Sequence, residues 1–212
     1  MGRFQAIDLE VDSALCRELR IPIVRRFTGG GAVYHDEGNL NFTILNRRTG
    51  EPLTTIHETN SSYIIAALKK LGLQSEHPVP NSVHVNNRKI SGAACALSPN
   101  YVLWHASILV STNTATLTRI LSPSREALRS KFIRSKWSPV TTLNEHLSAP
   151  VNIETFSLQL TRSIRELTGV EIESGRLSEV EVERARTLYD RKYGLSTWNL
   201  HGTSGNKEEG RT

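Results

Sequence analysis

The amino-acid sequence predicts an α+β protein in which helices pack on a mostly antiparallel or mixed sheet. Two observations predict this class. Short β-rich runs separated by turn residues dominate the first half of the chain, and segments with helix-capping residues dominate the second half. No internal repeat is visible. The 212 residues, of which 38% are hydrophobic, suffice to bury a core.

The first half is expected to hold two helices and several strands. Gly72 is a natural stop for a helix that begins near Thr55. Asn86 and Asn87 tolerate the positive φ angles of a tight hairpin turn between two short strands. The expected helices are 9–18 and 55–71, and the expected strands are 21–24, 41–45, 83–85, 88–91 and 102–110.

The second half is expected to hold three capped helices. Ser124 can cap a helix over 125–132, Asn152 one over 153–167, and Ser178 one over 179–192. Gly169 ends the middle helix. The last residues, 201–212, are polar and contain glycine, so they are expected to form a disordered tail.

Composition limits the classes of function. The net charge of +5 and the isoelectric point near 9.4 favour acidic partners, but the charge is spread out and no nucleic-acid-binding motif accompanies it. Two cysteines are too few for a disulfide framework, and no apolar run reaches membrane-spanning length. We therefore expect a soluble cytoplasmic protein that binds neither nucleic acid nor membrane.

The run Arg25 to Phe42, RRFTGGGAVYHDEGNLNF, is the strongest candidate site. Three glycines let a backbone approach a ligand closely, and arginines bind carboxylates or phosphates. Neither a Walker A motif nor a dinucleotide fingerprint is present. Three glycines alone favour a simple turn. The neighbouring arginines and the Tyr34-His35-Asp36 run shift the balance toward a site for an anionic small molecule.

A second candidate is Lys89, which precedes the small residues Gly92-Ala93-Ala94 on an expected strand. A strand lysine is often a solvated edge charge, yet it can also stabilise charge on a phosphate or a reacting carboxylate. Spacing alone leaves the two interpretations even.

Three other reactive residues carry weaker signals. His105 is interpreted as structural, and His35 beside Asp36 is the better functional candidate, although no spacing predicts a metal site. Cys95 could act as a nucleophile, but its small apolar neighbours favour a buried, inert thiol.

The chain resembles the lipoate-protein ligase A family of the biotin and lipoate ligase superfamily. The resemblance rests on RRFTGGGAVYHDEGNLNF, on NSVHVNNRKISGAA at 81–94 and on LWHASILV at 103–110, in this order and spacing. It extends to GRFQ at 2–5 and to residues 188–200, which contain YDRKYGLSTWNL. Together these segments cover nearly the whole chain and form a specific signal.

This resemblance implies a catalytic domain over residues 1–200 that uses ATP, Mg²⁺ and lipoate. Lipoate would be converted to lipoyl-AMP and then transferred to a lysine of an acidic lipoyl domain or of the glycine-cleavage H protein. Lys89 is the implied catalytic residue, in contact with both the lipoate carboxyl and the phosphate. The implied ATP-binding residues are Arg26, Gly31, Ala32, Val33, Tyr34 and Lys89, and the implied lipoate-binding residues are Gly29, Gly30, His35, Lys89, Gly92 and Ala93.

The chain also departs from the family pattern. Family members usually carry several dozen residues before GRxQ, so the resemblance implies an N-terminal truncation or a misassigned start, with part of the sheet missing. Ser82 and Asn113 stand where aspartates are common. The lack of a domain after Trp198-Asn199 resembles split archaeal-type enzymes, in which a separate protein supplies an accessory domain.

Two alternatives remain open at the level of sequence. One is an octanoyl or lipoyl transferase of the same fold, which takes its acyl group from a carrier protein through a cysteine thioester. Cys95 is the only cysteine suited to that step, but its position relative to Lys89 is unexpected. The other is a non-catalytic paralogue that binds lipoyl-adenylate.

Overall fold

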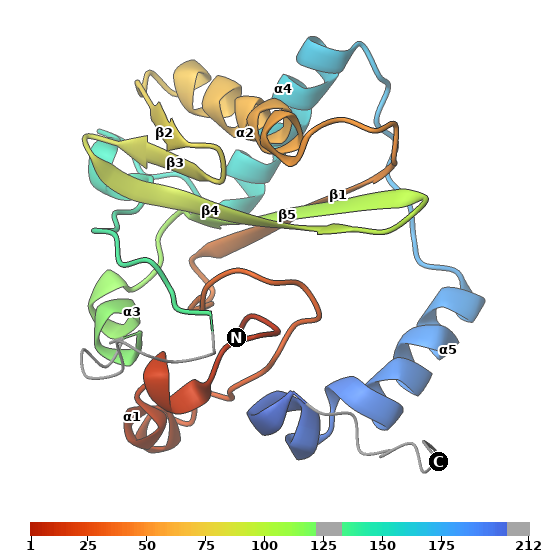
Figure 1. Cartoon of the computed structure of the whole chain (residues 1–212). Coiled ribbons are helices and arrows are strands. Elements are labelled where there is room, and N and C mark those ends of the chain that lie inside the picture. The colour runs from red at the N-terminus through yellow and green to blue at the C-terminus, as the bar shows by residue number, and fades with distance from the viewer. Residues whose placement is uncertain (122–132, 203–212) are drawn as a thin grey trace. The chain divides into compact units, whose positions relative to one another are not determined.

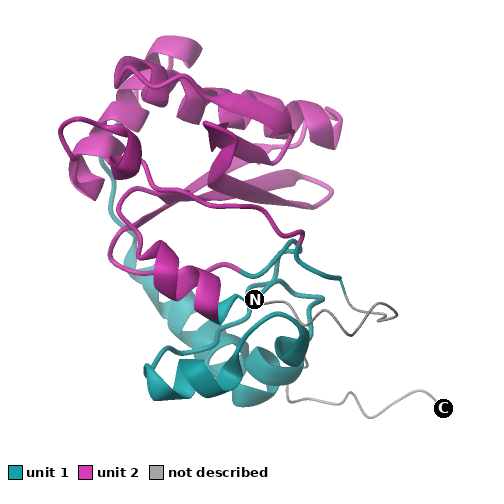
Figure 2. Cartoon of the chain, turned by 90° about the vertical axis from the view of Figure 1, so that its left-hand side faces the viewer, with its two compact units in different colours: residues 1–32, 120–135, 173–212 teal, residues 33–119, 136–172 magenta. Residues whose placement is uncertain are grey.

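The structure is a computed structural model that describes residues 1–121 and 133–202. The chain divides into two compact units, which are coloured separately in Figure 2. Unit 1 contains residues 1–32, 120–135 and 173–212, and unit 2 contains residues 33–119 and 136–172. The predicted helix over 125–132 and most of the predicted tail, 203–212, lie outside the described residues.

Unit 2 is built on a five-stranded sheet in which every pair of neighbouring strands is antiparallel. Helices α2 (Leu53–Lys70) and α4 (Ile153–Thr168) lie on one face of this sheet (Figure 1). A short helix α3 (Thr114–Ile120) and a 3₁₀ turn η2 (Asn144–His146) follow the sheet in sequence. In spatial order the strands are β1 (Asn39–Arg47), β5 (Tyr101–Leu109), β4 (Arg88–Leu97), β3 (Ser82–Val85) and β2 (Glu76–Val79).

The core of unit 2 lies between these helices and the sheet. Alternate residues of β5 are buried, as expected for a strand with one face on a core. The indole of Trp104 is fully buried, and its Nε1 donates a 2.9 Å hydrogen bond to Nδ1 of His57 on α2. Lys70 and Glu166 form an ion pair between α2 and α4. The buried apolar residues include Ile64, Leu68, Val83, Ile90, Trp104, Ile108, Leu143, Phe156 and Leu160.

Unit 1 is held together by the side chain of Arg25. It contains a 3₁₀ turn η1 (Ile7–Leu9), helices α1 (Ser13–Glu18) and α5 (Glu179–Leu188), and two π-helical turns, η3 (Tyr189–Tyr193) and η4 (Thr197–His201). The buried Arg25 guanidinium donates to six carbonyls, those of Gly2, Arg3, Gln5, Trp198, Asn199 and Leu200. The indole of Trp198 donates in return to the Arg25 carbonyl at 2.8 Å.

The turn and cap predictions agree well with the structure. Asn86 and Asn87 adopt φ angles of 49° and 60°, and Gly72 and Gly169 adopt 79° and 67°. Asn152 caps α4 through the amide of Thr155, at 2.7 Å. Ser178 and Glu181 form a capping box at the start of α5. These features are local, so the sequence predicts them directly.

Other expected elements were wrong or incomplete. Residues 21–24 form no strand: Pro22 has no amide hydrogen, and Val24 is largely exposed. The single helix expected over 9–18 is replaced by η1 and α1, because Asp12 caps a new start through the amide of Leu15. Strand β2, which contains Pro78, and helix α3 were not predicted. Within the described ranges, none of the helices combines the length and the hydropathy needed to cross a membrane.

Candidate active site

The three consecutive glycines, Gly29 to Gly31, form a loop in unit 1 that we call the glycine loop. The side chain of Arg26 holds this loop. The guanidinium of Arg26 donates to the carbonyls of Gly29 and Gly31 at 2.6 and 2.8 Å, and to the Thr28 hydroxyl at 3.0 Å. Gly30 adopts a φ of 88°, which a side chain would disfavour. Burial lowers the pKa of Arg26 from its usual value. Arg26 therefore shapes the loop that contains the three glycines.

The residues that follow the loop belong to unit 2. Tyr34 is half-buried, and burial together with the charge of Asp36 raises the pKa of its phenol. His35 is exposed. The two carboxylate oxygens of Asp36 accept hydrogen bonds from the amides of Gly38 and Asn113, at 3.0 and 2.8 Å. Both oxygens of the Asp36 carboxylate are thus engaged with backbone amides.

Lys89 lies on β4 with its main chain fixed on both sides. Its amide donates to the Pro139 carbonyl at 2.7 Å, and its carbonyl accepts from the Thr141 amide at 3.0 Å. Arg88 anchors the same segment through the Val140 carbonyl, at 3.1 Å. The backbone that presents Lys89 is therefore rigidly positioned within unit 2.

The side chain of Lys89 folds over Gly92. A Cβ atom at position 92 would lie 2.7 Å from Cε and 2.8 Å from Nζ of Lys89. Burial alone lowers the pKa of the Lys89 ammonium. Within the described parts of the chain, no carboxylate forms an ion pair with Lys89. Lys89 is partly buried, and a partly desolvated cation without a protein counter-ion is suited to bind an anionic ligand.

The predicted site residues fall into two sets. Lys89, Gly92 and Ala93 lie on one strand of unit 2, where the Ala93 amide donates to the Asn81 carbonyl at 2.9 Å. The structure brings Lys89 into contact with Gly92. Val33, Tyr34 and His35 also belong to unit 2, whereas Arg26, Gly29, Gly30, Gly31 and Ala32 belong to unit 1.

Cys95, Ser82 and Asn113 make contacts within the fold of unit 2. Cys95 packs against the core of unit 2, and burial raises the pKa of its thiol, which opposes thiolate formation. Ser82 is buried and its hydroxyl bonds to the His84 ring at 2.7 Å. Asn113 accepts from the Thr116 amide at 2.9 Å and so supports the first turn of α3.

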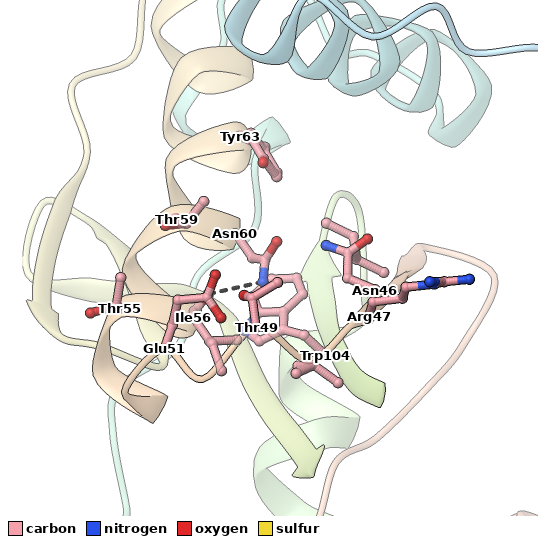
Figure 3. A pocket seen from close by; sticks show the side chains of 12 residues that line it. Asn46, Arg47, Thr49, Glu51, Thr55, Ile56, Thr59, Asn60, Tyr63 and Trp104 are labelled. Carbon is pink, nitrogen blue, oxygen red and sulfur yellow. Dashed lines mark hydrogen bonds between the residues drawn. The ribbon is translucent and has the colours of Figure 1, made fainter. Parts of the chain in front are cut away.

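Two of the cavities formed by the described residues lie away from the predicted site residues. One, of about 340 Å³, is lined by α2, β1 and β5 (Figure 3), with Thr59, Asn60 and Tyr63 from the helix and Trp104 from the sheet. The other, of about 760 Å³, is lined within unit 1 by residues such as Gln5, Cys16 and Arg25. Neither is lined by Lys89 or by the three glycines.

Sequence reasoning missed a polar network behind the glycine loop. Glu10, Ser135 and Gln5 are linked to the amide of Ala32 by hydrogen bonds. Gln5 belongs to the GRFQ segment, which is part of the resemblance to the ligase family. Glu10 and Ser135 are separated by 125 positions, and no local sequence pattern relates them. Their connection requires the folded chain.

Comparison with known proteins places the chain in a family. Residues 1–165 match the lipoyl protein ligase A/B catalytic domain, and the chain belongs to this family. Lipoate-protein ligase A subunit 1 of Thermoplasma acidophilum is 31% identical over 210 residues, which cover 94% of this chain and 79% of that protein. Lipoate–protein ligase 1 of Staphylococcus aureus is 30% identical over 199 residues. That match covers 94% of this chain but 60% of the relative, so the chain spans about three fifths of the relative's length.

Solved structures show the same fold. A lipoate protein ligase from T. acidophilum with bound lipoic acid and a lipoate-protein ligase A with bound ATP each superpose with a TM-score of 0.82 at 30% identity. Both matches cover 94% of this chain and 80% of the other. The bipartite T. acidophilum ligase, solved in a study of its E2 lipoyl domain, gives a TM-score of 0.84 at 29% identity and covers 98% and 81%. The predicted family, α+β fold and enzyme class, lipoate-protein ligase, are confirmed.

Proposed function

We propose that the chain activates lipoate with ATP and transfers the lipoyl group to a lysine of a lipoyl domain. In the first step a lipoate carboxylate oxygen attacks the α-phosphorus of ATP, and pyrophosphate leaves. In the second step the acceptor amine attacks the carbonyl carbon of lipoyl-AMP, AMP leaves, and the amine loses a proton. The acceptor would be an E2 lipoyl domain or the glycine-cleavage H protein.

The observation that carries this proposal is the partly buried ammonium of Lys89 over Gly92. The reaction gathers negative charge on a carboxylate and a phosphate, and a fixed cation in a desolvated site stabilises such charge strongly. Lys89 needs no covalent chemistry for this role, because positioning and electrostatics suffice. Membership of a family with lipoate-bound and ATP-bound relatives supports the assignment of the two anions.

The remaining site residues receive roles as part of the same proposal. Arg26 and the backbone of Gly31, Ala32, Val33 and Tyr34 would hold the nucleotide, while Gly29, Gly30, His35, Gly92 and Ala93 would line the lipoate site. We propose that residues 1–200 act together as one catalytic domain, although the chain folds into two compact units.

Mg²⁺ enters this proposal as the partner of ATP. Within the described residues, no group of three or more His, Cys, Asp or Glu side chains could hold a metal ion. Mg²⁺ commonly binds through substrate phosphates and keeps several waters, so ATP itself can supply its ligands. Bound there, it would neutralise phosphate charge.

The net charge of the chain and the similarity to a bipartite ligase indicate the proposed protein partners. A net charge of +5 favours docking of an acidic lipoyl domain, and the T. acidophilum ligase named as bipartite supports a separate accessory protein. Two unpaired cysteines and the requirement for ATP lead us to infer a cytoplasmic location.

Mass spectrometry of an acceptor lipoyl domain tests this proposal. The chain is incubated with lipoate, ATP, Mg²⁺ and the acceptor, with and without the accessory subunit. We expect the acceptor to gain one lipoyl group, and an acceptor whose target lysine is replaced by arginine to gain none. Transfer from an acylated carrier protein without ATP, abolished by Cys95→Ala, would instead establish a transferase.

A further inference from the structure

The carboxylate of Glu10 is buried behind the glycine loop. Its side chain is 1% exposed. Both carboxylate oxygens accept from the Ser135 amide at 3.0 Å, and Oε1 also accepts from Nε of Arg134 at 3.1 Å. Burial of a carboxylate is unfavourable unless donors replace its water, and these donors come from one short segment of chain. Glu10 therefore fixes the Arg134–Ser135 segment.

The hydroxyl of Ser135 extends this contact to the glycine loop. Its Oγ accepts from the Ala32 amide at 2.9 Å and from Nε2 of Gln5 at 3.0 Å. A Cβ atom at Gly31 would lie 2.8 Å from the same Oγ, so only glycine allows this close approach. The loop thus contacts Ser135 through both a hydrogen bond and direct packing.

Gln5 links the network to the start of the chain. Its side chain is buried, and its Oε1 accepts from the Gly2 amide at 2.9 Å. Every member of this network belongs to unit 1. The conformation of the Ala32 amide therefore depends on Glu10 through one intermediate residue.

We propose that Glu10 is a positioning residue of the glycine loop, which it holds through Ser135 in the conformation that presents the loop backbone to the nucleotide. The catalytic part of this proposal rests on the proposed function, in which Ala32 and its neighbours bind ATP. A loop that is already ordered before the ligand arrives binds it more tightly, because binding then requires no further loss of conformational entropy in the loop.

Amide hydrogen exchange measured by NMR tests the positioning without any substrate. Glu10→Gln keeps the shape but turns an amide NH₂ toward the donors of Arg134 and Ser135, and Ser135→Ala removes the hydroxyl. Glu183→Gln, in an exposed ion pair with Arg186, is the matched control. The Leu15 amide, bound by Asp12 at 2.9 Å, is the reference within the same unit.

We expect the Ala32 amide to exchange roughly tenfold faster in Glu10→Gln and Ser135→Ala, with Leu15 and the control unchanged. Unchanged exchange at Ala32 would overturn the proposal. Equal acceleration at Ala32 and Leu15 would also overturn it, because that pattern indicates a general loss of stability. If Glu10→Gln does not fold, Glu10→Asp, which keeps the charge but shortens the side chain, takes its place with the same expected result.

Steady-state kinetics then test the link to the nucleotide. Both variants should raise KM for ATP several-fold and change kcat less, because the loop is proposed to bind ATP rather than to react. An unchanged KM in both variants would refute that link. If the wild-type chain forms no adenylate, the proposed function fails, while the exchange measurement still decides whether Glu10 positions the loop.

Discussion

At the scale of single residues, Lys89 combines a stability cost with a proposed catalytic role. Its side chain is partly buried, and this desolvation lowers the pKa of the ammonium. The folded state then binds fewer protons than the unfolded state in the window from the lowered pKa up to the ordinary value of 10.5. Stability therefore rises as pH increases through that window, and below it the partly desolvated charge opposes folding.

Lys89→Met should separate stability from activity. The substitution keeps an unbranched side chain and removes the partly desolvated charge, so the variant should be at least as stable as wild type near neutral pH. Adenylate formation should fall at least about 100-fold, because the cation that stabilises the transferring centre is gone. Urea denaturation measures the first effect and lipoyl-AMP formation the second.

The pH dependence supplies the internal control for this prediction. The difference in stability between Lys89→Met and wild type should shrink as pH rises toward 10.5. A variant that unfolds more easily than wild type at neutral pH would contradict the view that Lys89 is a partly desolvated charge with no counter-ion among the described residues.

Gly92→Ala should disturb Lys89 directly. The new methyl would lie 2.7 Å from Lys89 Cε, which forces the side chain away from its place. We expect adenylation to fall while the protein stays folded, as judged by circular dichroism and urea denaturation. Gly175→Ala is the matched control, since a Cβ atom there meets no atom within 4 Å. Equal activity of the two variants would show that the position of Lys89 over Gly92 is unimportant.

At the scale of elements, the contact between α2 and the sheet depends on the protonation of a histidine. Nδ1 of His57 accepts from the buried Trp104 indole. Burial, and to a lesser extent the charge of His77, lowers the His57 pKa. The neutral His57 ring therefore stabilises the folded state fully above pH 6.5, the pKa of histidine in the unfolded chain. That contribution is lost as the pH falls from 6.5 through the lowered pKa of the folded state.

Unfolding free energies of wild type and His57→Ala between pH 5 and 8 test this contact. The variant should lose roughly 1–3 kcal/mol at pH 8, because the indole N–H of Trp104 is left without its acceptor. The loss should be smaller at low pH, where wild type has already lost part of the contribution. The exposed His201→Gln serves as control, and a constant difference across this range would refute the assignment.

Helices and turns could be predicted from the sequence where their ends are set by residues that are close together in the chain. Asn152, Gly169 and Ser178 fixed the ends of α4 and α5, because capping involves residues only a few positions apart. The run Ile21 to Val24 has a strand-like composition but forms no ladder, since sheet pairing depends on distant partners. Strand β2 was missed because Pro78 argues against a strand, although Pro is tolerated at a sheet edge.

At the scale of the whole molecule, the site was predicted mainly through the resemblance to a known family. From the spacing of residues alone, Lys89 could equally be a solvated surface charge or a functional cation. The structure adds its burial and its contact with Gly92. Contacts such as those of Arg25 with residues 198–200 join segments about 175 positions apart, and no local pattern predicts them.

Lipoate-dependent exchange of labelled pyrophosphate into ATP is the sharpest test of whether this chain forms lipoyl-AMP. It detects reversible lipoyl-AMP formation without an acceptor and is run with and without the accessory subunit. The account predicts exchange that requires lipoate and that falls at least about 100-fold in Lys89→Ala. Folded wild-type chain that shows no lipoate-dependent exchange in either condition, or Lys89→Ala that retains wild-type exchange, would contradict it.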